Sequence, residues 1–344
     1  MITVLSGGFG GARFARGLVD AGLDVTLVVN TADDLKIFNA YVSPDVDMCL
    51  HALAGELDEH QGWGLLGDTY TVFDGLPARD RGWFRIGDLD LGFGVTRAEW
   101  LHQGMTLTAA TDALAKARGV TTTVLPMTDG VVRTMVDTPI GRLALQEFLV
   151  LHQGAPEVLA VHQYVSDGTC ASSQVLAALR DAEVVVIGPS SPVASVLPIL
   201  DLLGVRDVLK RRFGPTVAVT PVVCSSAPVR RPEAFRYDIR ERFLATRGVS
   251  HTPEGVASLY LDIIDGFVGD VRDGVTFNGR VGRRGLPVAT VLADTLAPPG
   301  QGRVDLAIEV VGFGRAIGSF PVTEAGNRGH GPSSSSQRAR GIVT

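Results

Sequence analysis

The stretch VLSGGFGGARFARGL, residues 4–18, joins a short apolar segment to a glycine cluster and then to a helical pattern. Glycines at such a turn allow the N–H groups of a helix start to approach a phosphate closely. The stretch is not a P-loop, because the Gly-Lys-Ser/Thr ending is missing. It also departs from the dinucleotide fingerprint, since Arg13 replaces the third glycine counted from Gly8, and the second strand ends in Asn30 rather than an acid. Two interpretations remain: an anion-binding turn over residues 7–11, or a turn that is only tight.

Short apolar segments alternate with helical patterns along the whole chain. The predicted strands are 2–5, 25–29, 121–125, 183–187 and 216–220, and the predicted helices are 11–22, 44–55, 107–118, 172–181, 193–203 and 254–265. Strands that are apolar on both faces are typical of a parallel sheet covered by helices. The pattern therefore predicts an α/β fold with a doubly wound, mostly parallel, Rossmann-like sheet, in which ligands lie beyond the carboxyl ends of the strands.

Composition excludes several classes of protein. The 344-residue chain has a net charge of −6 without a dense basic block in its body, which argues against nucleic-acid binding. It has no apolar run of about 20 residues for a membrane span, and its start does not resemble a signal peptide. Three widely spaced cysteines indicate a reduced, cytoplasmic protein without disulfides or structural zinc. We expect one domain over residues 1–324 and a disordered tail, rich in Gly and Ser, over residues 325–344.

Carboxylates follow several predicted strands, and they suggest a metal site. Asp45 and Asp47 lie at the start of a predicted helix, after Ser43 as N-cap and Pro44 as the first helical residue. They are about 200° apart round a regular helix. Either one of them faces the site while the other caps the turn, or the helix begins later. The helix dipole alone also favours a carboxylate at Asp45.

Further carboxylates lie in the segments NTADD, GDLDLG and PMTDG, at Asp33, Asp34, Asp88, Asp90 and Asp129. Carboxylates opposite phosphate-binding glycines suit magnesium-assisted phosphoryl chemistry, because Mg²⁺ prefers oxygen ligands. The segment GPSSP, residues 188–192, is a second candidate for anion binding, since two serines precede a helix start. A serine N-cap followed by proline explains the same segment equally well.

Together these segments resemble the 2-phospho-L-lactate transferase family of coenzyme F420 biosynthesis, called CofD in archaea and FbiA in actinobacteria. The matching blocks are SGGFGGAR, VVNTADDL, VSPDVDMCLHALAGELDEHQGWGLLGDT, WFRIGDLDLG, VLPMTDG, LALQEFLV, VVIGPSSPVASVLPIL, VAVTPVVCSSAPV and VLADTL. They keep the family's order from residue 2 to about residue 313. The resemblance implies an α/β sheet core with an added smaller region of helices and strands, so that residues 1–324 form a CofD-like transferase domain.

The resemblance also implies an enzyme that transfers a substituted phosphate group. The donor is a guanosine diphosphate that carries a 2-phospholactyl, enolpyruvyl or 3-phosphoglyceryl unit. The terminal hydroxyl of the ribityl chain of the deazaflavin FO attacks the donor phosphorus, and GMP leaves. Mg²⁺ is required, the partners are these small molecules, and a homodimer is implied.

The family's roles carry over onto three groups of residues. The donor nucleotide would be held by Ser6, Gly7, Gly8, Gly10, Gly11, Asn30, Thr31, Gly188, Pro189, Ser190 and Ser191. Asp45 and Asp47 would be catalytic and would hold the metal. Asp47 would also contact the acceptor FO together with Gly87, Asp88, Leu89 and Asp90.

The chain departs from the family pattern at a few positions. Leu89 stands where a base is usual, Gly-Phe-Gly replaces Ala-Thr-His at 92–94, Ser191 replaces an asparagine, and Gly130 replaces a second aspartate. Losing a cation beside the acceptor leaves open a relative that uses another hydroxyl acceptor. A nucleotide- or sugar-phosphate-binding regulator, similar to the related YvcK group, is a third hypothesis.

Large aromatic side chains gather next to the segment GDLDLG, among them Trp63, Trp83, Phe84, Phe93 and Trp100. They suit a flat ligand such as FO or an interface. Ordinary core packing explains each of them equally well.

Overall fold

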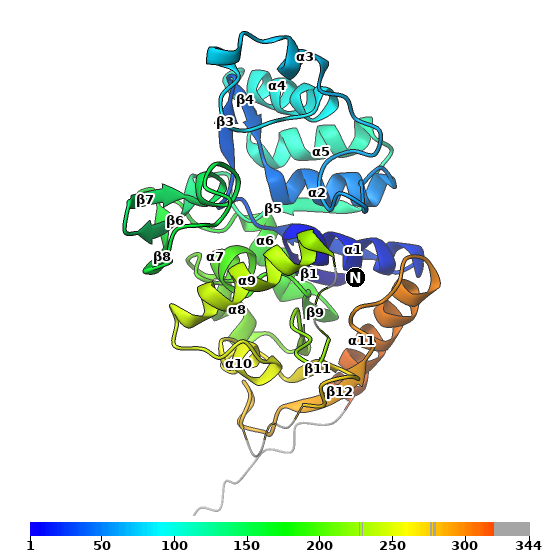
Figure 1. Cartoon of the computed structure of the whole chain (residues 1–344). Coiled ribbons are helices and arrows are strands. Elements are labelled where there is room, and N and C mark those ends of the chain that lie inside the picture. Colours follow the sequence, from blue (N-terminus) through cyan, green and yellow to red (C-terminus); the bar gives the residue numbers. More distant parts are fainter. Residues whose placement is uncertain (227, 229, 276, 278–279, 320–344) are drawn as a thin grey trace, which may run out of the picture.

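A seven-stranded parallel sheet forms the centre of the molecule (Figure 1). The computed structural model describes residues 1–319 except 227, 229, 276 and 278–279. The strands lie in the order β12-β11-β10-β9-β1-β2-β5, and each pairs in parallel with its neighbours. Their bounds are β1 Ile2–Ser6, β2 Val25–Val29, β5 Thr123–Pro126, β9 Val184–Ile187, β10 Thr216–Val219, β11 Gly266–Asp270 and β12 Ala289–Ala293. The predicted doubly wound α/β fold is confirmed.

Helices cover both faces of this sheet. Successive strand residues alternate between two buried clusters: Leu5 and Val28 pack on one side, and Val4 and Leu27 pack on the other. The first cluster includes residues of α6 (Ser173–Asp181), η3 (Pro192–Val196), α7 (Leu197–Leu200), α8 (Val205–Arg211), α9 (Arg231–Ala245) and α10 (Pro253–Ser258). The second includes residues of α1 (Gly8–Asp20), α2 (Pro44–Ala54), α5 (Leu107–Ala117) and α11 (Gln301–Ser319). Burial on both faces explains why the central strands are predominantly apolar.

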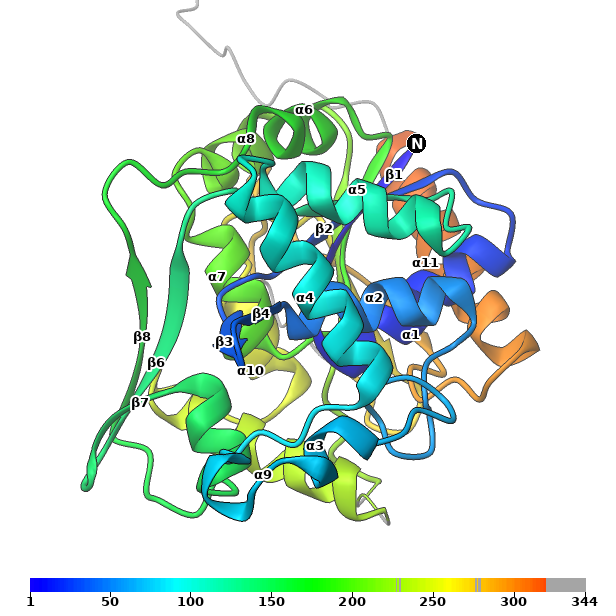
Figure 2. The same cartoon turned by 90° about the horizontal axis from the view of Figure 1, so that it is seen from above.

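Two excursions of the chain form the expected smaller region of helices and strands. Between β2 and β5 lie the hairpin β3 (Leu35–Ile37) and β4 (Ala40–Val42), then α3 (Thr71–Gly75), η1 (Ala78–Asp80) and α4 (Asp88–His102), drawn at the top of Figure 1. Between β5 and β9 the antiparallel sheet β7-β6-β8 consists of β6 (Val132–Thr138), β7 (Gly141–Ala144) and β8 (Ala160–Val165). This sheet lies at the left of Figure 2, with the π-helical turn η2 (Glu147–Leu151) between β7 and β8, and α6 then leads to β9.

Several elements differ from the sequence-based predictions. The patterns miss β11, which contains two glycines, and the half-exposed edge strand β12. They also miss α4, α11 and α9. In α9, seven of the fifteen residues are charged, and they conceal the apolar stripe of that helix. The helix predicted over 193–203 is divided into η3 and α7, because Pro198 lacks the N–H that would continue it. The helix predicted over 254–265 ends at Ser258. The predicted boundary at residue 324 and the tail 325–344 lie outside the described residues.

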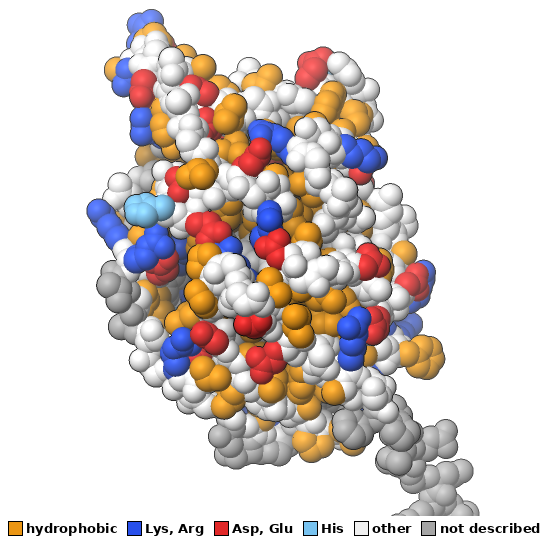
Figure 3. All heavy atoms as spheres, turned by 90° about the vertical axis from the view of Figure 1, so that its right-hand side faces the viewer, with side chains coloured by type: hydrophobic (Ala, Val, Ile, Leu, Met, Phe, Trp, Pro, Cys, Tyr) orange, Lys and Arg blue, Asp and Glu red, His pale blue; other side chains and the backbone are white. Residues whose placement is uncertain are grey.

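The surface carries charges of both signs. On the face shown in Figure 3, acidic and basic side chains are interspersed with hydrophobic ones. This mixture differs from the basic stripe that is typical of a nucleic-acid-binding face. Among the described helices, none combines the length and the apolar character that a membrane span requires.

The order of the strands reverses at β1. The chain proceeds from β1 through β2 to β5 at one edge, and β9 then returns to the other side of β1 before β10, β11 and β12 follow outward. The loops after β1 and β9 therefore leave neighbouring strands in opposite directions, which opens a crevice at the carboxyl ends of the strands. The segments SGGFGG and GPSSP lie in these two loops.

Candidate active site

The glycine loop after β1 and the serine loop after β9 contact each other at the crevice. The Gly7 N–H donates a hydrogen bond of 3.1 Å to Ser190 Oγ. A Cβ atom on Gly10 would lie 2.3 Å from the carbonyl oxygen of Pro189. Gly8 has a φ of +61°, a conformation that disfavours any other residue type. These loops thus require glycine for their own packing, whatever ligand they also hold.

We expect Gly10→Ala to lower the free energy of unfolding by about 1–3 kcal/mol, because the added methyl group overlaps a backbone carbonyl that cannot move freely. Gly312→Ala is the matched control, since a Cβ at that position of α11 meets open space. It should raise stability by about 1 kcal/mol through helix propensity. Urea unfolding of the two variants measures the difference. Equal stability of Gly10→Ala and wild type would contradict the close contact between the loops.

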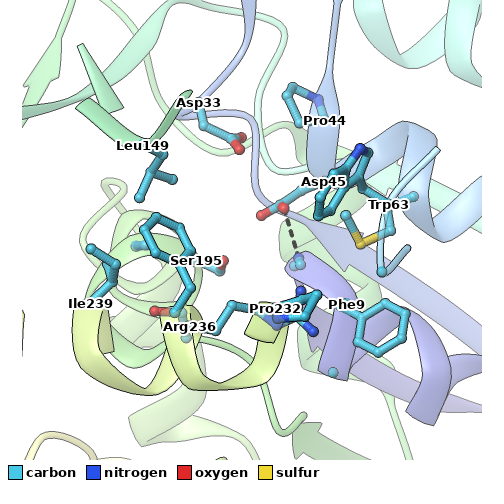
Figure 4. A pocket seen from close by; sticks show the side chains of 18 of the residues that line it. Phe9, Asp33, Pro44, Asp45, Trp63, Leu149, Ser195, Pro232, Arg236 and Ile239 are labelled. Carbon is cyan, nitrogen blue, oxygen red and sulfur yellow. Dashed lines mark hydrogen bonds between the residues drawn. The ribbon is translucent and has the colours of Figure 1, made fainter. Parts of the chain in front are cut away.

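Asp45 connects the start of α2 to the start of α1. Its Oδ1 accepts a hydrogen bond of 2.7 Å from the Gly8 N–H, and its Oδ2 accepts one of 2.9 Å from Asn30 Nδ2. The first N–H groups of a helix have no acceptor within the helix, and this carboxylate accepts from one of them. The positive end of the helix dipole stabilises its negative charge. Figure 4 shows Asp45 with its bond to the α1 start, at the wall of a cavity.

Asp33 lies close to Asp45 in the wall of this cavity, with its carboxylate facing that of Asp45 (Figure 4). The same Asn30 Nδ2 lies 3.3 Å from Asp33 Oδ1, and Gln146 Nε2 donates to Asp33 Oδ2 at 2.9 Å. Burial, followed by the negative charges of Asp45 and Asp34, raises the pKa of Asp33 well above its ordinary value. Burial also raises the pKa of Asp45. Two buried carboxylates that face each other in this way would be stabilised by a cation.

A Mg²⁺ ion would suit this pair. It prefers oxygen ligands and is commonly held by one or two carboxylates together with substrate phosphates. Among the residues that the structure describes, no group of three or more His, Cys, Asp or Glu side chains could hold a metal. Phosphate oxygens of a substrate would therefore have to complete the coordination. The metal itself stays a prediction, with Asp33 and Asp45 as the residues that fit it.

Asp47 lies in an ion pair. Both of its carboxylate oxygens accept hydrogen bonds from the fully buried guanidinium of Arg97 on α4, and Oδ2 also accepts from the Ser43 N–H at 3.2 Å. Arg97 Nη1 further donates to the Tyr41 carbonyl at 2.9 Å. Of the arrangements that the sequence leaves open, Asp45 thus faces the site and Asp47 caps the helix start. Asp47 also lines the cavity, with its charge paired to Arg97, and its predicted catalytic and metal roles stay predictions.

A cavity of about 1070 Å³ opens over these loops. The predicted site residues in its wall are Gly7, Gly8, Gly10, Asp45, Asp47, Gly87, Asp90, Pro189 and Ser191. Other predicted donor-binding residues are buried and do not line the cavity, namely Ser6, Gly11, Asn30, Thr31, Gly188 and Ser190. The structure therefore brings the two predicted anion-binding loops and the acidic pair to one place.

Asp88 and Leu89, at the start of α4, do not line this cavity. Asp88 accepts hydrogen bonds from the Thr69 hydroxyl and from two backbone N–H groups of α3, at 2.6–3.0 Å. Leu89 is 49% exposed, and its N–H donates to Asp68 Oδ1. The structure does not bring these two residues to the cavity, and their predicted contacts with the acceptor stay predictions.

The aromatic residues near α4 divide into two groups. Trp63, Tyr70, Trp83 and Phe84 line the cavity, and all of them come from the segment between α2 and α4. By contrast, Phe93 and Trp100 belong to the hydrophobic cluster around α1 and α2. The first group offers flat apolar surfaces to a ligand, whereas the second serves core packing.

The cavity also has a basic wall, which the sequence patterns do not predict. Arg13, Arg85, Arg231, Arg236, Arg240 and Arg303 line it. Three of these six come from α9, and the guanidinium of Arg236 lies 4.8 Å from the ring centre of Phe9, beside the glycine loop. Figure 4 shows α9, with Arg236 and Ile239, opposite Asp33 and Asp45. A polyanionic ligand could thus lie between arginines and a metal.

His251 packs against α9 and is sensitive to pH. Its ring lies 4.2 Å from that of Tyr237, and burial, aided by the charge of Arg240, lowers its pKa to about 4. The unfolded chain therefore binds more protons than the folded one between pH 6.5 and 4. The free energy of unfolding decreases as pH falls through that range. We expect His251→Gln to lose less stability than wild type between pH 7.5 and 5, measured by urea unfolding. Parallel losses in the two proteins would contradict this.

Comparison with known proteins shows the family of the chain. The family model described as 2-phospho-L-lactate transferase CofD matches residues 2–239. The chain belongs to this family. A 2-phospho-L-lactate transferase of Methanospirillum hungatei is 36% identical over 301 residues, which cover 86% of this chain and 97% of that protein. A phosphoenolpyruvate transferase of Streptomyces griseus is 33% identical over 322 residues, which cover 90% and 99% of the two chains.

A solved structure shares the fold of this CofD-family chain. A UPF0052-family protein from Bacillus halodurans aligns with a TM-score of 0.55 and 17% identity, covering 90% of this chain and 99% of that one. At this identity the similarity concerns the fold alone.

The predicted site omits residues that the structure places in the cavity wall. Ser195, Gln146 and the arginines of α9 lie there. Asp33 had a signal in the sequence, since it follows β2 in the acidic segment NTADD. The arginines of α9 had no such signal in the sequence, because no strand or glycine motif directly precedes them. Their charges resemble those of a solvent-exposed helix.

Proposed function

We propose that this chain transfers a phosphorylated small acid from a guanosine diphosphate-linked donor to the ribityl hydroxyl of FO, with release of GMP, in coenzyme F420 biosynthesis. The observation that carries this proposal is the meeting of two glycine- and serine-rich loops with the Asp33–Asp45 pair at the reversal of strand order. Relatives named 2-phospho-L-lactate transferase and phosphoenolpyruvate transferase support the same reaction class.

The donor's diphosphate suits the loops after β1 and β9. Gly8 and Gly10 at the start of α1 line the cavity, and the positive end of a helix dipole favours phosphate oxygens. In the unliganded protein the Gly8 N–H is bonded to Asp45. Arg236 supplies a positive charge close to the same loop, through its contact with Phe9. Asp33 and Asp45 would hold Mg²⁺, which when bound supplies positive charge to the transferring phosphoryl group.

The acceptor suits the aromatic part of the cavity. FO is a planar tricycle with a polar chain, so it needs flat apolar surfaces beside a polar centre. Trp63, Tyr70, Trp83 and Phe84 provide such surfaces. In phosphoryl transfer, positioning and charge stabilisation do most of the catalytic work. We therefore assign the protein's contribution to orienting the two substrates and excluding water from between them.

The test is a reaction with purified protein, FO, Mg²⁺ and each of the three candidate donors. We expect FO-dependent release of GMP, and a product whose mass equals that of FO plus the phosphorylated acid less one water, as for a phosphodiester. Absence of FO-dependent GMP release with all three donors would overturn the proposal. Release of GMP with another hydroxyl acceptor would instead favour a divergent transferase.

A further inference from the structure

Arg240 is a cation of the cavity wall without a counter-ion among the described residues. It is half-buried, its Nε is buried without a hydrogen-bond acceptor, and none of the ion pairs between described residues includes it. By contrast, Arg13 and Arg303 both contact Glu59. A guanidinium that is partly removed from water without an acceptor costs free energy. Its place in a cavity wall indicates an anion that arrives with a ligand.

Arg236 lies one helical turn before Arg240, on the same face of α9. Burial, and then the positive charge of Arg236, lowers the pKa of Arg240 to about 10. The two cations therefore destabilise each other, and a bound anion would relieve this. Arg236 lies at the end of the cavity wall near the glycine loop, where its guanidinium contacts the ring of Phe9. Arg240 lies about 6 Å further along the helix axis.

We propose that Arg240 binds the carboxylate of the small acid carried by the donor. This inference rests on the proposed function, in which the diphosphate occupies the glycine loops beside Arg236. The acid then extends along α9, where Leu149, Ile239 and Phe243 line the cavity with apolar surface. A planar guanidinium matches a carboxylate with two parallel hydrogen bonds, and apolar surroundings strengthen that interaction.

Arg240 is thereby a specificity-determining residue, because it separates donors with a carboxylate from esters without one. We test it by calorimetry with three ligands. They are GDP, a GDP-linked phospholactyl donor, and the matched isopropyl ester, in which a methyl group replaces the carboxylate of the lactyl unit. The proteins are wild type, Arg240→Gln, Arg240→Lys and Arg180→Gln. Arg180 is the control because it pairs with Asp181 on the surface, outside the cavity wall.

We expect Arg240→Gln to weaken binding of the phospholactyl donor about 10- to 100-fold, as for a lost hydrogen bond to a charged group. Binding of GDP and of the isopropyl ester should stay unchanged. Arg240→Lys should restore part of the loss, and Arg180→Gln should behave as wild type. The melting temperature of unliganded Arg240→Gln should not fall, because the substitution removes an uncompensated cation.

The possible results separate the inference from the proposed function. An unchanged affinity of Arg240→Gln for the donor, or an equal loss for all three ligands, overturns the inference alone. A lower melting temperature with an equal loss for every ligand assigns Arg240 a structural role and also overturns it. A wild type that binds neither GDP nor the donor overturns the proposed function, and this inference with it.

Discussion

Asp45→Asn and Asp33→Asn are each expected to lower turnover by about two orders of magnitude or more, which corresponds to about 3 kcal/mol of transition-state stabilisation. The reason is that the two carboxylates lie close together in the cavity wall and share the Asn30 amide. An asparagine keeps the shape and one acceptor oxygen but loses the charge that would hold Mg²⁺. Steady-state release of GMP with saturating FO and donor, over a range of Mg²⁺ concentrations, measures the effect.

Stability should respond differently from turnover in the Asp33→Asn variant. Burial and neighbouring negative charges raise the pKa of Asp33, so its charge destabilises the unliganded protein. Removing that charge should leave the melting temperature unchanged or raise it. Asp129→Asn is the matched control, because Asp129 accepts from the Thr108 N–H at the start of α5 and does not line the cavity. Wild-type turnover in both Asp33→Asn and Asp45→Asn would contradict the assignment of the acidic pair.

Much of the fold could be predicted because the central strands have a simple pattern. β1, β2 and β9 are mostly apolar and wholly buried, since helices cover both faces of the sheet. β11 was missed because its glycines and terminal aspartate interrupt that pattern, although all five of its residues are buried. Local composition therefore predicts a strand well only where side chains, rather than close backbone packing, fill the space around it.

The place of the cavity was predictable from the loops that follow strands. The glycine loop and the serine loop could be located in this way, and Asp45 from its position at a helix start, while their roles stay predictions. The choice between Asp33 and Asp47 as the partner of Asp45 could not, because it depends on where Arg97 of α4 lies. The arginines of α9 could not be assigned either, since a helix of mixed charge does not reveal which of its faces lines a cavity.

Arg97→Met is expected to destabilise the protein by about 3–5 kcal/mol, the usual cost of leaving one partner of a buried ion pair without its counter-charge. Asp47→Leu should cost a similar amount, because the guanidinium of Arg97 is fully buried and would lose its carboxylate. The pair connects α2 to α4, and so joins the excursion after β2 to the sheet core. Urea unfolding of both single variants and of the double variant measures the coupling.

The double variant distinguishes a structural Asp47 from a catalytic one. If the pair is structural, Arg97→Met/Asp47→Leu should be less destabilised than the sum of the single variants, because neither charge is then left alone. Additive costs would contradict the pairing seen here. Asp47→Asn adds the functional half of the test. If Asp47 is a metal ligand, this variant should have lower turnover at unchanged stability. If Asp47 only forms the ion pair, the variant should have a lower free energy of unfolding, which high Mg²⁺ should not restore.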